Sequence, residues 1–152
     1  MKTPLLTALV LAQLALVAVG VAPQLSARVS GETHLIRTAP VDPIDPFRGA
    51  YVDLAYPGLT REDDSAPSGT VHVELLEDGE YVRPGRWLRT RPDRGPYLTC
   101  RSDGWRARCG IESLFVSQER ARSLERDLVD GGVAEITVDS RGNAAVLDVR
   151  AP

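Results

Sequence analysis

The sequence predicts a mainly β fold with one α-helix, an α+β domain built as a small antiparallel sheet or barrel-like sandwich behind an N-terminal transmembrane helix. Three observations predict this class. The chain begins with one long apolar run. The remainder holds about eight short segments of alternating hydrophobicity, with turn signals every ~8–12 residues. One later segment has helical periodicity. Strands do not alternate with helices, so a parallel nucleotide-binding sheet is not expected.

The apolar run from Leu5 to Ala22 predicts a membrane anchor and makes the membrane the first expected partner. Its ~18 residues are at the short end for a membrane-spanning helix. A cleaved signal peptide is the alternative, but cleavage after Ala22 would place Pro23 next to the scissile bond. We expect a retained anchor and spacer over residues 1–27 and one extracytoplasmic domain over residues 28–152. The protein would then cross the cell membrane once, with a polar spacer from Pro23 to Gly31.

The composition argues against several kinds of site. Lys2 is the only lysine, so the domain lacks the lysine of a Ser–Lys dyad, a Schiff base or a P-loop. The net charge of −3 points to no particular partner. Asp42 and Asp45 could offer oxygens to a cation, but each precedes a proline and is better explained by turn hydrogen bonds. We expect no cofactor and no metal.

The segment from Pro40 to Tyr56 organises the start of the sheet. Three prolines at every third position keep its first half extended. Gly49 then permits a turn, and the residues after it alternate as in a strand. Val52, Leu54 and Tyr56 fall on the face that we expect to be buried.

This segment resembles the signature of the GDYXXLXY protein family, membrane-anchored bacterial proteins of uncharacterised function. Gly49, Tyr51, Leu54 and Tyr56 match the motif, whereas Ala50 stands at the position of its Asp. The sequence GIE-LFV at 110–116 and the helix after it are also similar to the family. The likeness runs from about residue 35 to the C-terminus. It implies a membrane-anchored protein and supplies no activity, and Ala50 favours an architectural role for the motif.

The other elements follow from alternation and turn residues. We expect strands at Glu32–Val41, Thr70–Leu76, Glu80–Val82, Trp87–Leu88, Tyr97–Cys100, Trp105–Ile111, Val133–Val138 and Ala144–Val149, and a short apolar run at Leu114–Val116. The pairs Asp78-Gly79 and Pro84-Gly85 predict turns, and Asp139–Asn143 predicts a hairpin loop. Ser117 predicts the N-cap of a helix over Gln118–Val129, which Gly131-Gly132 ends. Its apolar face would carry Ala121, Leu124, Leu128 and Val129.

Cys100 and Cys109 are the only cysteines, and we expect a disulfide between them. An extracytoplasmic location permits this bond. Asp103-Gly104 between them is a hairpin signal. A four-residue loop from Asp103 to Arg106 would set Cys100 directly opposite Cys109, whereas a two-residue loop would not.

Residues that could carry chemistry do not form a recognisable catalytic set. His34 and His72 alternate with apolar neighbours, so both are expected on the solvent side of their strands. No G-x-S-x-G nucleophile elbow occurs. We therefore assign no catalytic residue and lean toward a protein that is not an enzyme. A serine-type hydrolase acting in the envelope, using a serine with one of the histidines, is the alternative.

Eight arginines and two aspartates lie between residues 83 and 108, and aromatic residues interleave them. In an extracytoplasmic domain, anionic lipid or an envelope polymer is a better partner than nucleic acid, which is not expected. We predict a non-enzymatic binding domain or a subunit of a complex with a membrane protein at the cell envelope. The candidate binding residues are Arg48, Tyr51, Asp53, Arg86, Trp87, Arg101 and Trp105.

Overall fold

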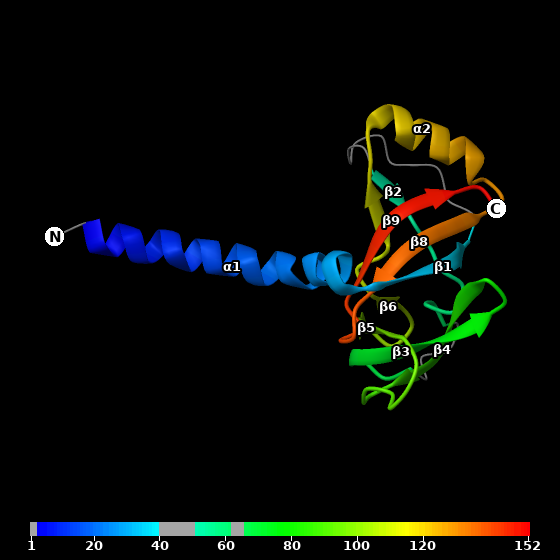
Figure 1. Cartoon of the computed structure of the whole chain (residues 1–152), viewed down its shortest axis with the longest axis horizontal. Helices are drawn as coiled ribbons and strands as arrows, with labels where there is room; N and C mark the ends of the chain where they lie inside the picture. Colours follow the sequence, from blue (N-terminus) through cyan, green and yellow to red (C-terminus); the bar gives the residue numbers. More distant parts are fainter. Residues whose placement is uncertain (1–2, 40–50, 62–65) are drawn as a thin grey trace.

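A computed structural model describes residues 3–39, 51–61 and 66–152 of the 152-residue chain. A long helix, α1 (Thr3–Ser30), leads into a β domain that a shorter helix, α2 (Gln118–Asp127), covers on one side (Figure 1). The domain is a curled, half-barrel sheet of seven strands in the order β6-β5-β3-β4-β1-β8-β9, beside a two-stranded sheet of β2 and β7. The predicted class, mainly β behind an apolar N-terminal helix, is confirmed.

The strands are short and follow the predicted order. Their bounds are β1 Glu32–Thr38, β2 Tyr51–Asp53, β3 Gly69–Asp78, β4 Tyr81–Leu88, β5 Tyr97–Ser102, β6 Ala107–Arg108, β7 Ser113–Phe115, β8 Gly132–Val138 and β9 Ala144–Arg150. Neighbouring strands are antiparallel except β1 and β4, which pair in parallel at Ile36 and Val82. The large sheet is therefore mixed and not wholly antiparallel. The proline-spaced entry, residues 40–50, lies outside the described residues.

The predicted turn at Pro84-Gly85 is wrong, because β4 continues through both residues. The strand accommodates them with a register shift against β3, where Val73 pairs with Trp87 but Leu75 pairs with Pro84. Two residues of β4 thus lie opposite one of β3, which is a β-bulge. Proline is tolerated in a strand at such a position, because an N–H is not needed in the ladder there.

The core lies inside the curl of the large sheet and under α2. Alternate residues of β3, Val71, Val73 and Leu75, are buried as predicted. Ala121, Leu124 and Leu128 form the buried face of α2, which begins at its predicted N-cap Ser117. Val129 does not belong to this face. It is 61% exposed, because the helix ends at Asp127 and the chain turns away.

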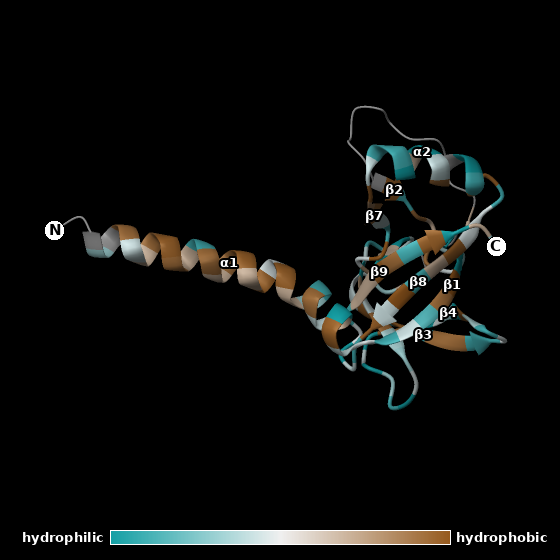
Figure 2. Cartoon of the chain, turned by 45° about the horizontal axis from the view of Figure 1, so that its top comes forward, coloured by the Kyte–Doolittle hydropathy of each residue, from teal (hydrophilic) through white to brown (hydrophobic). Residues whose placement is uncertain are grey.

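The predicted spacer after the anchor is part of the same helix, because α1 continues without interruption past Ala22 and Pro23 to Ser30. Figure 2 shows apolar residues along most of this helix and hydrophilic ones in its last turns at the domain. The segment Leu6–Ser30 is long and apolar enough to cross a membrane.

The last two turns of α1 pack against β8 and β9. Ala27 is fully buried, and the hydroxyl of Thr137 donates a hydrogen bond of 2.9 Å to its carbonyl oxygen. Arg28 donates to the carbonyl oxygen of Val146 on β9, with the two atoms 3.3 Å apart. Gly31 makes this approach possible, since a Cβ there would lie 2.3 Å from Oγ1 of Thr137. The helix is therefore docked on the sheet, and a single residue joins it to β1.

The β8–β9 hairpin closes the same end of the half-barrel by bonding to β5. The Thr99 N–H donates to the carbonyl oxygen of Gly142 at 2.7 Å, and its hydroxyl donates to that of Arg141 at 2.8 Å. The Tyr97 hydroxyl donates to the Ser140 carbonyl oxygen at 3.2 Å. The hairpin thus links the two halves of the curled sheet next to the end of α1.

Candidate functional site

The two stretches that resemble the family signature pair with each other. Val52 of β2 lies opposite Leu114 of β7. The Leu54 N–H donates to the Glu112 carbonyl oxygen at 2.7 Å. The hydroxyl of Tyr56 donates to the Ile111 carbonyl oxygen at 2.8 Å.

The packing of this pair gives the signature a structural use. Leu54 and Tyr56 are 1% and 4% exposed, respectively. Burial holds the pKa of Tyr56 far above its ordinary value, and the charge of the Glu112 carboxylate adds a smaller contribution in the same direction. A tyrosine in this state is a neutral hydrogen-bond donor. Leu54 and Tyr56 therefore support the core, whereas Gly49 lies outside the described residues.

The predicted disulfide between Cys100 and Cys109 is present. The register of β5 and β6 pairs Ser102 with Ala107, which leaves the expected four-residue loop between them. The Asp103 carboxylate accepts from the Arg106 N–H at 2.9 Å, and this bond contributes most to the lowering of its pKa. After the second cysteine, the Glu112 carboxylate accepts from the N–H groups of Cys109 and Gly110. The hairpin is thus fixed at both ends.

The residues predicted to bind a partner are dispersed. The guanidinium of Arg86 forms two hydrogen bonds of 2.9 Å with the carboxylate of Glu74, which lowers the pKa of that carboxyl. Trp87 is 8% exposed and donates to the Gly58 carbonyl oxygen. Asp53 is exposed on β2.

Trp105, in contrast, is 47% exposed. It lines a cavity of about 160 Å³ with the signature residues Leu54 and Tyr56. Arg48 and the side chain of Tyr51 lie outside the described residues.

The placement of His72 on the solvent side was wrong. His72 is 8% exposed, because the edge of the Tyr97 ring covers it at a centroid distance of 5.5 Å. Its Nδ1 lies 3.2 Å from the Thr99 hydroxyl, which already donates to a carbonyl oxygen, so Nδ1 must carry the proton and donate. Burial and then the charge of Arg91 lower the pKa of His72.

His34 also differs from the prediction. It is only partly exposed, and its Nε2 is buried without a hydrogen-bond partner in the described part of the chain. Within these residues, neither histidine is hydrogen-bonded to a serine.

Arginines gather at the end of the domain from which α1 leaves. Arg101 of β5 lies directly opposite Arg108 of β6, and both are exposed. The two residues line a cavity of about 240 Å³ with Gly69 and Asp103. Like charges placed opposite each other on neighbouring strands are destabilising unless a counterion lies between them. Arg101 was among the predicted binding residues, and its partner Arg108 could have been found from the register that pairs the cysteines.

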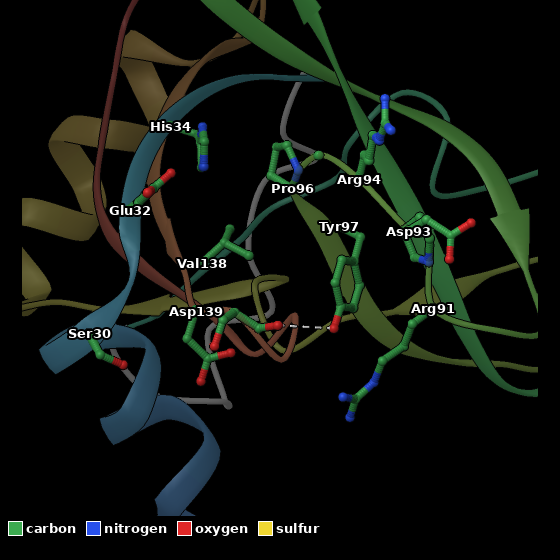
Figure 3. Close-up of a pocket in the computed structure, with 13 residues that line it drawn as sticks. Ser30, Glu32, His34, Arg91, Asp93, Arg94, Pro96, Tyr97, Val138 and Asp139 are labelled. Atoms are coloured by element: carbon green, nitrogen blue, oxygen red, sulfur yellow. Dashed lines mark hydrogen bonds between the residues drawn. The ribbon is translucent and has the colours of Figure 1, made fainter.

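A cavity of about 590 Å³ opens at the same end (Figure 3). One wall is β1 and the end of β8, from which Glu32, His34 and Asp139 come. The other wall is Tyr97 and the loop before it, residues 91–96. Figure 3 shows Glu32 and His34 projecting from β1 toward Tyr97 and this loop. No sequence pattern indicates this cavity, because its walls come from segments far apart in the chain.

Asp139 joins the cavity to α1. Its carboxylate accepts a hydrogen bond of 2.6 Å from the Ser26 hydroxyl and one of 2.8 Å from the Asn143 amide. Burial alone would raise its pKa, but these bonds and those from the N–H groups of Arg141 and Asn143 lower it to about 2. Asp139 is therefore an ionised structural anchor for the helix.

Comparison with known proteins gives one match. The sequence model of the GDYXXLXY protein family matches residues 13–149. No curated protein matches the chain. No solved structure matches it either.

Proposed function

We propose a function for this chain, which belongs to the GDYXXLXY protein family. It is a membrane-tethered extracytoplasmic domain that binds anionic lipid headgroups at its basic end, next to α1. The proposal assigns it no catalysis. Its apolar N-terminal helix would cross the membrane once, and the domain would lie against the outer surface of that membrane.

The length of α1 supports this placement. Its 28 residues span about 42 Å at 1.5 Å per residue, whereas the hydrocarbon core of a bilayer is about 30 Å thick. Roughly eight residues therefore remain to cross the headgroup layer. They include Ala27 and Arg28, which are docked on β8 and β9. The docked end of the domain would thus be held at the level of the headgroups.

The opposed pair Arg101 and Arg108 is the observation that carries the proposal. The two arginines meet across β5 and β6, and the labels of these strands lie at the α1 end of the domain in Figure 1. Among the described residues neither forms an ion pair. A phosphate between the two guanidinium groups would neutralise both charges and could accept bidentate hydrogen bonds. The disulfide beside them agrees with an oxidising, extracytoplasmic compartment.

Hydrogen–deuterium exchange of the full chain in lipid nanodiscs tests the proposal. We expect residues 97–110 to exchange more slowly in nanodiscs with phosphatidylglycerol than in those with phosphatidylcholine alone. Salt should reduce this protection, because it screens exposed charges. The Arg101→Gln/Arg108→Gln variant should lose the protection.

The matched control carries the same change of charge away from the proposed surface. Arg83→Gln/Arg126→Gln alters β4 and the exposed face of α2, so it should keep the protection. Equal exchange in the two kinds of nanodisc, or protection that survives in the Arg101→Gln/Arg108→Gln variant, would contradict the proposal.

A further inference from the structure

The 590 Å³ cavity has charges of opposite sign on opposite walls. Glu32 stands on the β1 wall, and Arg91 and Arg94 stand on the loop wall. None of the three has an ion-pair partner among the described residues. Two more acids line the cavity: Asp93 stands on the loop wall between the two arginines, and Asp139 is an ionised carboxylate that Arg141 compensates from 3.6 Å. The cavity is therefore dipolar, because Glu32 on one wall is unpaired and the loop wall carries two arginines against one aspartate.

The position of the cavity limits what can reach it. Ser30, the last residue of α1, lines it together with Asp139, to which α1 is bonded through Ser26. If α1 crosses a membrane, the cavity lies at the level of the lipid headgroups. A volume of about 590 Å³ is within the range of small-molecule sites and accommodates a headgroup.

We propose that this cavity binds a headgroup that carries both a phosphate and a primary ammonium group, as an ethanolamine phospholipid does. The phosphate lies at the arginine wall, mainly at Arg91, and the ammonium donates hydrogen bonds to Glu32. This assignment rests on the proposed function, because it needs the domain to lie at the membrane surface, and it adds a zwitterionic class of lipid that binds at a separate site.

The chemistry predicts an order of affinities. A glycerol headgroup has the phosphate but offers no cation to Glu32. A choline headgroup has the cation, but its three methyl groups replace the N–H donors. Ethanolamine is the headgroup that satisfies both walls, so it should bind about tenfold more tightly than either, which corresponds to one charge-assisted hydrogen bond.

Native mass spectrometry of the full chain in detergent micelles tests this order by titration with the three lipids. Glu32→Gln should lower the affinity for the ethanolamine lipid about tenfold and leave that for the glycerol lipid unchanged. Arg91→Gln should weaken all three. The controls Glu80→Gln and Arg89→Gln make the same changes outside the cavity lining and should behave as the wild type.

Free phosphoethanolamine distinguishes headgroup recognition from binding of the acyl chains. In large excess it should displace the lipid from the wild type. Equal affinities for the three lipids, an unchanged ethanolamine affinity in Glu32→Gln, or no displacement by phosphoethanolamine would each overturn the assignment.

The two proposals can fail separately. The exchange experiment reads the salt-sensitive protection of residues 97–110 by anionic lipid, whereas this one reads the headgroup selectivity of Glu32. Loss of selectivity with intact protection would remove the cavity assignment alone.

Discussion

Gly142 sits at the tip of the β8–β9 hairpin with a φ of +76°, a conformation that residues with a side chain rarely adopt. A Cβ at this position would lie 2.5 Å from Cε2 of Tyr97 and 2.6 Å from Oγ1 of Thr99. The glycine is thus needed twice, for its backbone angle and for the contact between the hairpin and β5.

We expect Gly142→Ala to lower the free energy of unfolding by at least ~2 kcal/mol, because backbone strain and the steric clash act together. Gly79→Ala is the matched control. It has a φ of +70° but open space around the added atom, so it should cost only about 1 kcal/mol. Chemical denaturation measures both, and equal losses would show that the contact with Tyr97 contributes nothing.

At the scale of single residues, sequence patterns predicted the burial of side chains where it depends only on the strand that carries them. Val52, Leu54 and Tyr56 are buried as their alternation requires. His72 obeys the same alternation, yet the opposite face of its strand is covered as well, by Tyr97. That cover depends on how the sheet curls and on the loop before Tyr97, which no periodicity encodes.

At the scale of elements, the β5–β6 hairpin combines a short loop with the Cys100–Cys109 disulfide. Residues 100 and 109 are nine apart in sequence. Closing a loop of this size stabilises a fold by about 2–3 kcal/mol in the chain-entropy description.

We therefore expect reduction of the disulfide to lower the free energy of unfolding by about 2–3 kcal/mol. Chemical denaturation with and without reductant measures this loss. In a Cys100→Ala/Cys109→Ala variant, reductant should have no effect. Titration of two free thiols in the oxidised, folded protein would contradict the bond itself.

The ends of helices and strands could be predicted where a capping or turn residue marks them. They could not be predicted where tertiary packing determines them. Ser117 caps α2 as expected, and the hairpin loops fall at their Asp and Gly residues. Helix α1 instead continues through Pro23, although proline usually interrupts a helix. Its last turns pack against β8 and β9, and this tertiary contact is absent from the local sequence. Likewise, the bulge that admits Pro84 into β4 depends on the neighbouring strand.

At the scale of the molecule, the candidate site could be predicted least. Arg101 was predicted as a binding residue from an arginine-rich stretch. Its proposed role also requires Arg108, which lies opposite it on the neighbouring strand. The dipolar cavity unites Glu32, Arg91 and Asp139, although 59 residues separate the first two and 48 the last two. Only the topology of the half-barrel brings them together.

The bond between Asp139 and α1 predicts how the stability of the whole chain varies with pH. The pKa of Asp139 falls from 3.8 to about 2 in the folded protein, so its contribution is complete above about pH 4 and disappears as the pH falls toward 2. The shift corresponds to about 2 kcal/mol. Thermal unfolding of the full chain in detergent micelles over this range should show the loss.

Asp139→Asn should be less stable at neutral pH and should lack this part of the pH dependence. The comparison separates the effect of Asp139 from that of His72. The lowered pKa of His72 also makes the protein less stable as the pH falls, but this loss begins near pH 6.5. Parallel curves for the two proteins below pH 4 would rule out the role of Asp139.

The junction between α1 and the sheet contains no hinge. Ser30 ends the helix, Glu32 begins β1, and Ala27, Arg28 and Ser26 are each bonded to β8, β9 or the loop between them. These bonds oppose rotation of the domain relative to its helix. Transmembrane helices tilt when the bilayer is thinner than their apolar length. If α1 crosses a membrane, as we propose, a change in membrane thickness would therefore rotate the domain together with its helix and change which of its surfaces meets the lipid.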